Sequence, residues 1–248
     1  MLERLAAKHD VAYLLTRPDR PRGRGQRVGS PPAKETAERL GVEVRQPETL
    51  VDFDPGEDVV VLAAYGALIP EPVLARALWL NVHPSLLPRW RGAAPIERAL
   101  MAGDPETGVT IIKLVPELDA GPIAAQRAFP VGEEDDFGTV SARAAEHGVE
   151  LLNEVLPGPA FRPQPEEGVT YAEKIGPADR ELDWTRPVPE LLNRIRALSP
   201  HIGARAELHG KPVTVWRARI EGGKLVPVEV QPEGGRRMDY EAFLRGLR

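Results

Sequence analysis

An amide and an imidazole stand two residues apart where an apolar stretch of the chain ends, at Asn81 and His83. Alternate side chains of a β-strand point to the same face, so both groups would project together from a strand end. Asp119 follows a second apolar stretch and would add a carboxylate. An amide can donate to a developing oxyanion, an imidazole can carry a proton, and a carboxylate can hold the imidazole. These residue types predict a functional site at the strand end rather than part of the core.

The alternative for His83 taken alone is a structural histidine whose ring is satisfied by its neighbours. That interpretation is retained for His9, His147, His201 and His209, which lack the combination of an amide and a carboxylate that accompanies His83. Their spacing also fits no metal site.

Apolar and amphipathic stretches alternate along the first 156 residues. This alternation predicts an α/β protein with a Rossmann-like, mostly parallel sheet and helices on both faces. Ligands of such sheets bind beyond the carboxyl ends of the strands, where Asn81 and His83 are expected. Strands are expected at 11–15, 42–45, 58–64, 80–83, 109–114 and 123–129, and helices at 33–40, 72–78, 96–101 and 137–156.

Prolines at positions 157, 159, 163 and 165 interrupt this alternation, because proline removes a backbone donor and fixes φ. They predict a first domain over 1–159, a linker over 160–179 and a small, reduced, β-rich domain over 180–248. Within the last domain the pattern predicts a helix at 189–198, a hairpin of 205–208 with 213–218 around His209-Gly210, a strand at 225–230 and a terminal helix at 240–247.

The composition is that of a globular protein, with 42% apolar and 28% charged residues and a net charge of −5. The absence of cysteine excludes disulfides, zinc sites built on thiolates and a cysteine nucleophile. With no apolar stretch long enough to span a bilayer and no signal pattern, we expect a cytoplasmic protein that does not bind membranes.

Positive charge is concentrated between Arg17 and Arg27, a glycine- and proline-rich stretch that contains one acidic residue, Asp19. Such a loop can contact phosphates, although a solvated surface loop is the alternative on composition alone. We expect this loop to be irregular. Its arginines are Arg17, Arg20, Arg22, Arg24 and Arg27.

Several motifs occur in a fixed order and together resemble the folate-dependent formyltransferases over nearly the whole chain. The resemblance is closest to the members that act on methionyl-initiator tRNA. The motifs are Arg17-Pro18-Asp19-Arg20-Pro21-Arg22-Gly23-Arg24-Gly25, Ala64-Tyr65-Gly66, Asn81-Val82-His83, Ser85-Leu86-Leu87-Pro88-Arg89-Trp90-Arg91-Gly92, Thr107-Gly108-Val109-Thr110-Ile111, Leu118-Asp119-Ala120-Gly121, Thr170-Tyr171-Ala172-Glu173-Lys174 and Leu182-Asp183-Trp184.

The resemblance implies the formyltransferase fold and a transfer of formyl from 10-formyltetrahydrofolate, as co-substrate, to the amino group of methionyl-initiator tRNA, for translation initiation. It assigns catalysis to Asn81, His83 and Asp119, without a metal or a covalent enzyme intermediate, in a monomer. The implied folate contacts are Ser85, Leu86, Leu87, Pro88, Tyr65, Gly66, Leu68 and Ile69. The implied tRNA contacts are Arg24, Arg20, Arg22 and Arg27.

Two departures from the family pattern lead to alternatives. The chain starts at Met1 within what would be the first helix, so we expect the family's first strand to be missing, and the C-terminal domain is expected to be an open, reduced sheet against the terminal helix. One alternative is the same chemistry on a small amine, such as glycinamide ribonucleotide or an amino-sugar nucleotide. Another is an inactive folate- or RNA-binding remnant.

Overall fold

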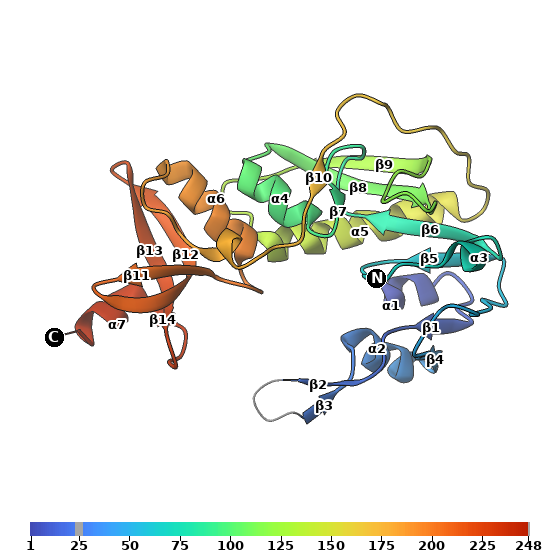
Figure 1. The fold of residues 1–248 in the computed structure, drawn as a ribbon, viewed down its shortest axis with the longest axis horizontal. Coiled ribbons are helices and arrows are strands. Elements are labelled where there is room, and N and C mark those ends of the chain that lie inside the picture. The colour runs from blue at the N-terminus through green and yellow to red at the C-terminus, as the bar shows by residue number, and fades with distance from the viewer. Residues whose placement is uncertain (23–26, 248) are drawn as a thin grey trace. The chain divides into compact units, whose positions relative to one another are not determined.

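The computed structural model describes residues 1–22 and 27–247, with only the backbone described at 21, 22, 27 and 28 (Figure 1). The chain forms two compact units, each assembled from three separate stretches. Unit 1 comprises Met1–His83, Thr110–Gln126 and Ala145–Gln164, and unit 2 comprises Pro84–Val109, Arg127–Ala144 and Pro165–Arg248. The boundaries at 159 and 179 inferred from the prolines stay a prediction.

Unit 1 contains helices α1 (Leu2–Ala6), α2 (Pro32–Leu40) and α3 (Glu71–Leu74) and strands β1 (Tyr13–Leu15), β2 (Arg20–Arg22), β3 (Arg27–Gly29), β4 (Glu43–Arg45), β5 (Val59–Leu62) and β6 (Leu78–His83). Strands β8 (Glu106–Lys113) and β9 (Ile123–Pro130) and helix α5 (Phe137–Val155) run from one unit into the other. The strands form parallel pairs β1–β4 and β5–β6, and the larger sheet has the order β5-β6-β8-β9.

The α/β class is confirmed, but β8 runs antiparallel to β6, so that His83 pairs with Thr110 and Leu80 pairs with Lys113. Burial gives no signal of this direction, because an apolar strand buried on both faces has the same pattern beside either kind of partner. In β6 every residue from Trp79 to His83 is buried.

Prolines and glycines set the ends of the helices. Helix α2 begins at Pro32 and stops before Gly41, and α4 (Pro95–Ala102) begins at Pro95 and stops before Gly103. Both glycines have a φ of 72°, the left-handed conformation that ends helices and that other residues adopt only with strain. The sequence therefore fixes where these helices end.

The core of unit 1 is centred on Trp79 of β6, which packs with Leu50, Ile69 and Val73. The indole is only 1% exposed, and its Nε1 donates to the Val73 carbonyl at 3.2 Å. This single bond satisfies the one polar atom of a large apolar side chain. The packing anchors β6, the strand that ends in Asn81 and His83.

Unit 2 contains β7 (Arg91–Gly92), α4, β10 (Tyr171–Ala172), the 3₁₀ turn η1 (Ala178–Arg180), α6 (Val188–Leu198), β11 (Ala204–Leu208), β12 (Lys211–Glu221), β13 (Lys224–Pro232), β14 (Met238–Asp239) and α7 (Tyr240–Arg245). The last four strands form an antiparallel sheet in chain order. Helix α6 contributes Leu191, Ile195 and Leu198 to the core beneath this sheet. Figure 1 shows α7 beside the same sheet.

Two tight turns connect the strands of this C-terminal sheet. His209 and Gly210, between β11 and β12, have φ values of 53° and 70°, and Gly222 and Gly223, between β12 and β13, have 55° and 75°. Two successive positive φ values match the right-handed twist of the paired strands. The predicted hairpin and the small antiparallel sheet are confirmed. Within the described residues no helix is both long and apolar enough to cross a membrane.

Candidate active site

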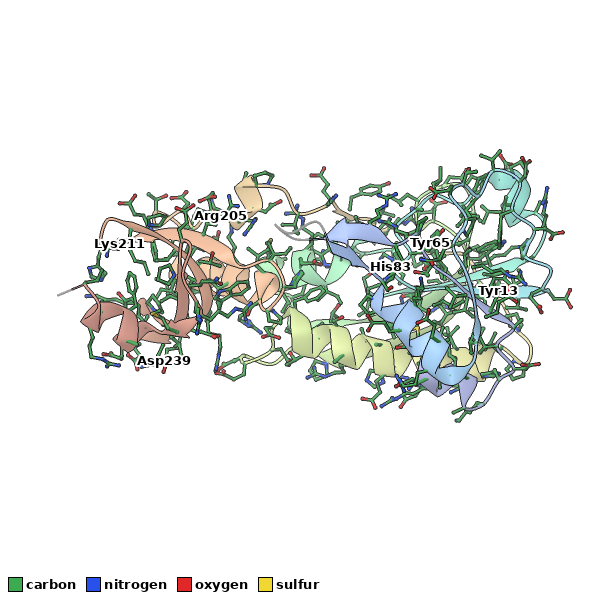
Figure 2. All side chains as sticks on the ribbon, turned by 90° about the horizontal axis from the view of Figure 1, so that it is seen from below. Tyr13, Tyr65, His83, Arg205, Lys211 and Asp239 are labelled. Atoms are coloured by element: carbon green, nitrogen blue, oxygen red, sulfur yellow. The ribbon has the colours of Figure 1, made fainter. Side chains whose placement is uncertain are left out.

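Asn81 and His83 lie at the carboxyl end of β6, as their spacing predicted. Both side chains are buried, with 9% of Asn81 and 4% of His83 exposed (Figure 2 labels His83). A buried amide and a buried imidazole need polar neighbours, because an unpartnered polar group inside a protein costs about 1–3 kcal/mol.

Asp119 supplies such a neighbour from the loop between β8 and β9. Asn81 Nδ2 donates to Asp119 Oδ1 at 3.3 Å, and His83 Nδ1 lies 3.5 Å from Asp119 Oδ2. All three residues belong to unit 1. The structure thus brings a carboxylate from 38 positions beyond Asn81 to the amide and the imidazole, with its side chain only 10% exposed.

The distance between the His83 imidazole and the Asp119 carboxylate limits how these two groups can act together. At 3.5 Å the imidazole and carboxylate are farther apart than the 2.7–2.9 Å or so of a strong charge-assisted hydrogen bond. A protonated imidazole at this distance is still attracted to the carboxylate, and a water or a reacting group can bridge the two. The arrangement suits a proton relay.

The backbone around Asp119 is held in an unusual conformation. Asp119 has a φ of 47°, a left-handed conformation that costs most residues about 1–2 kcal/mol. Gln164 Nε2 donates to the carbonyl of Asp119 at 2.6 Å and to that of Gly121 at 2.8 Å. A Cβ added at Gly121 would lie 1.7 Å from the Lys113 carbonyl oxygen, so only glycine fits. The loop's shape is therefore set by its immediate contacts.

Sequence reasoning missed Gln164 because it lies between Pro163 and Pro165, in the stretch that was predicted to be a linker. The backbone of Arg162 exchanges hydrogen bonds with that of Ile123, at 2.9 and 2.8 Å, which brings Gln164 to the Asp119 loop. No spacing in the sequence marks this pairing.

The residues predicted for the pterin pocket in unit 1 lie between β5 and α3, with different environments. Tyr65 packs against the core, where burial raises the pKa of its hydroxyl. Ile69 is buried in that core, whereas 83% of Leu68 is exposed. Gly66, with a φ of 64°, accepts a hydrogen bond from the Arg17 guanidinium at its carbonyl. Their assignment to folate stays a prediction.

The second predicted folate segment, Ser85–Pro88, follows β6 and belongs to unit 2. Ser85 and Leu87 are buried, and Leu86 and Pro88 are half-buried. The Ser85 hydroxyl donates to the Arg89 carbonyl at 2.6 Å, which folds the segment back on itself.

The arginine-rich stretch, expected to be irregular, forms an antiparallel hairpin of β2 and β3, with Arg20 opposite Gly29. Figure 1 shows the two strands extending from β1 and α2. Arg20 is exposed, the backbones of Arg22 and Arg27 pair with each other, and Arg24 lies outside the described residues. Irregular structure was expected from the glycines and prolines of this stretch, but a proline such as Pro21 is tolerated in a strand that has a neighbour on one side only.

A polar cluster of Asp19, Lys34 and Gln46 lies at the base of the hairpin. Lys34 Nζ donates to Asp19 at 2.6 Å, and Gln46 Nε2 donates to Asp19 at 2.9 Å. The hydrogen bond from Lys34 is the main reason why the pKa of Asp19 lies below its ordinary value. The single acidic residue of the stretch is thus engaged at the base.

A family model described as formyl transferase matches residues 2–156, and one described as formyl transferase, C-terminal domain, matches residues 174–224. A methionyl-tRNA formyltransferase of Dechloromonas aromatica is 42% identical, with 97% of this chain and 89% of that protein covered. One of Paracoccus denitrificans is also 42% identical, with 99% and 93% covered.

Solved structures agree on the fold. A methionyl-tRNA formyltransferase from Clostridium thermocellum superposes with a TM-score of 0.66 at 16% identity, over 81% of this chain and 92% of that one. HypX from Aquifex aeolicus, in complex with tetrahydrofolic acid, gives 0.61 at 20% identity, over 85% and 43%. At such low identity these likenesses concern the fold alone. The sequence matches go further, and the chain belongs to the formyl transferase family and, within it, to the methionyl-tRNA formyltransferases.

Proposed function

We propose that the chain transfers the formyl group of 10-formyltetrahydrofolate to the amino group of methionyl-initiator tRNA. The relatives at 42% identity, covered almost end to end, support this substrate pair over a small amine or an inactive remnant. The observation that carries the proposal is the Asp119 carboxylate beside both the Asn81 amide and the His83 imidazole.

Formyl transfer involves three changes at the formyl group. The amine nitrogen forms a bond to the formyl carbon, the formyl oxygen gains negative charge, and the carbon–nitrogen bond to the folate breaks. One proton must leave the attacking nitrogen and one must reach the folate nitrogen. In this proposal Asn81 donates an N–H to the oxyanion, which typically contributes about 3–4 kcal/mol to transition-state stabilisation.

His83 and Asp119 handle the protons. The imidazole can donate to the oxyanion when protonated and accept a proton when neutral. Asp119 orients the ring and orders the group that bridges the two side chains. The amine is itself the nucleophile, so alignment and charge stabilisation suffice without a covalent intermediate or a metal.

The two substrates are assigned to different parts of the chain. Ser85–Pro88 is proposed to contact the folate through backbone groups and the Ser85 hydroxyl, and Tyr65, Gly66, Leu68 and Ile69 are proposed to contact its pterin. Arg20, Arg22 and Arg27 of the β2–β3 hairpin, together with Arg24, which lies outside the described residues, are proposed to contact the tRNA, because the planar guanidinium pairs well with phosphates and base edges. We propose that the chain acts in the cytoplasm, since translation initiation takes place in that compartment. We also propose that it acts as a monomer.

The direct test is formylation of charged initiator tRNA by the purified chain with 10-formyltetrahydrofolate. We expect turnover on methionyl-initiator tRNA and, at matched concentrations, none on glycinamide ribonucleotide or an amino-sugar nucleotide. Turnover of a free amine but not of methionyl-tRNA would reject the proposed acceptor. Binding of folate without turnover of any acceptor would support the inactive remnant instead.

A further inference from the structure

The motif Thr170–Lys174 has no role in the proposed chemistry, yet its first residues lie along the segment that follows His83. Strand β10 pairs in parallel with β7, with Tyr171 opposite Arg91 and Ala172 opposite Gly92 (Figure 1). Both strands belong to unit 2. Residues 170–172 of the motif therefore form a strap that lies along the segment 88–92.

Thr170 makes three hydrogen bonds to this segment. Its N–H donates to the Pro88 carbonyl at 3.3 Å, and its own carbonyl accepts from the Arg91 N–H at 2.9 Å. Between these two, its hydroxyl accepts from the Trp90 N–H at 2.9 Å. The first two bonds use only the backbone, so the third is the one that depends on the residue type.

Trp90 is the position where such a bond matters most. Its φ of 64° is an unusual conformation for a bulky residue, and such a strained backbone persists only where surrounding contacts enforce it. The Trp90 indole donates to Asp104 at 2.8 Å, and Arg89 binds the same carboxylate at 2.7 and 2.9 Å. The backbone N–H of Trp90, which donates to the Thr170 hydroxyl, is a further fixed point.

The strap lies so close to Gly92 that a side chain at this position would not fit. A Cβ added at Gly92 would lie 2.7 Å from the Ala172 carbonyl oxygen. That carbonyl accepts hydrogen bonds from Ala93 at 2.8 Å and Ala94 at 3.2 Å. Further along, Arg98 of α4 donates to the Glu173 carbonyl at 3.1 Å. The strap is therefore held to the segment and to the start of α4.

Distortion at Trp90 would reach the proposed folate contacts within a few residues. The Ser85 hydroxyl donates to the Arg89 carbonyl at 2.6 Å, and Arg89 directly precedes Trp90. A change in the backbone at Trp90 rotates that carbonyl and with it the Ser85 hydroxyl and the peptide groups of Leu86 and Leu87.

We propose that Thr170 is a positioning residue for folate: its hydroxyl holds the Trp90 backbone so that the Ser85–Pro88 segment keeps the shape that binds 10-formyltetrahydrofolate. This inference rests on the proposed function, because it assumes that Ser85–Pro88 contacts the folate. Thr170 acts through Trp90 and does not touch the reacting atoms.

The test compares Thr170→Val with Thr170→Ser. Valine keeps the branched shape and the backbone bonds but removes the hydroxyl, whereas serine keeps the hydroxyl. We expect Thr170→Val to raise the KM for 10-formyltetrahydrofolate about tenfold, as loss of one hydrogen bond would do. Its KM for methionyl-tRNA and its kcat at saturating folate should stay within about twofold of the parent, and Thr170→Ser should restore the folate KM.

Thr185→Val is the matched control, because the Thr185 hydroxyl also makes one hydrogen bond in unit 2, to Asp183 at 2.7 Å. Its melting temperature can fall, but its folate KM should not change. An unchanged folate KM in Thr170→Val, or an equal rise in Thr185→Val, would overturn the inference. If Thr170→Val does not fold, Thr170→Ala removes the same hydroxyl and decides the question in the same way.

Calorimetric titration with 10-formyltetrahydrofolate separates this inference from the proposed function, because it needs no tRNA. Equal affinities of the parent and Thr170→Val would overturn the role of Thr170 and leave the proposed function standing. A parent that binds no folate would overturn the proposed function itself. Weaker binding by Thr170→Val, restored by Thr170→Ser, supports the inference whichever amine is the acceptor.

Discussion

The carboxylate of Asp119 serves two partners that have different chemistry. One oxygen accepts from the Asn81 amide, and the other faces the His83 imidazole. Because the amide is held by one of its two N–H groups, its plane is fixed while the second hydrogen can point toward an oxyanion. In the proposed mechanism the carboxylate thus orients both of the groups that act on the substrate.

Replacement of these side chains tests their roles. We expect His83→Ala to lower kcat by a factor of about 100–10,000, the usual range for a general acid–base group, and Asn81→Ala by about 100–1,000. Folate affinity, measured by titration, should change little because neither group is assigned to pterin binding. His209→Asn is the control, since His209 lies in an exposed turn of unit 2 where asparagine accepts the positive φ. Near-normal rates in both active-site variants would contradict the mechanism.

At the scale of elements, an ion pair links α4 to η1 in unit 2. Arg98 donates to both oxygens of Asp179 at 2.8 and 3.0 Å, and the Asp179 carboxylate also accepts from the Gly176 N–H at 2.9 Å. The hydrogen bond from Arg98 is the main reason why the pKa of Asp179 lies below its ordinary value. The ionised carboxylate therefore stabilises the folded state.

This link should depend on pH in a defined direction. Because the folded pKa is lowered, the stabilisation is complete above the unfolded pKa of about 3.9 and is lost as the pH falls through the folded value. We expect Asp179→Asn to reduce the free energy of unfolding by about 2 kcal/mol near neutral pH, measured with urea, and by much less near pH 2. Glu221→Gln, which breaks an exposed pair with Arg219, should change little at either pH. A pH-independent loss in Asp179→Asn would contradict this account.

Several helix ends and turns were predictable from single residues. Gly41 and Gly103 end helices, and His209-Gly210 forms a turn, because these residue types accept the positive φ that each position requires. The hairpin β2–β3 and the two-residue strands β7 and β10 were missed, because Pro21 and the short lengths leave no periodic signal. The Asn81–His83 pair followed from strand alternation, whereas the contact of Gln164 with the Asp119 loop depends on a long-range pairing that no local pattern contains.

On the scale of the whole molecule, the chain carries 37 acidic against 32 basic residues, so its net charge of −5 repels a polyanion at long range. In the proposed function, binding of tRNA relies on local positive charge, which is assigned to the β2–β3 hairpin with its exposed Arg20. The attraction acts at short range and is screened by salt.

The salt dependence of the reaction tests this distribution of charge. We expect the KM for methionyl-tRNA to rise steeply with potassium chloride, while the KM for folate rises far less. Arg20→Ala should lower the slope of log KM against log salt concentration by about 1, the effect of one lost phosphate contact. Arg4→Ala, which removes an exposed partner of Glu146 in the same unit, should leave the slope unchanged. Equal slopes in the parent and Arg20→Ala would remove Arg20 from the tRNA contacts.

The interleaving of the two units has a consequence for recombining this chain with its relatives. The chain passes between units after His83, Val109, Gln126, Ala144 and Gln164, and three of these crossings fall inside β8, β9 and α5. A single-crossover chimera of two parents therefore joins mismatched halves inside at least one unit. Exchanging one unit as a whole requires three separate inserts, with the two shared strands and the shared helix kept continuous at every junction.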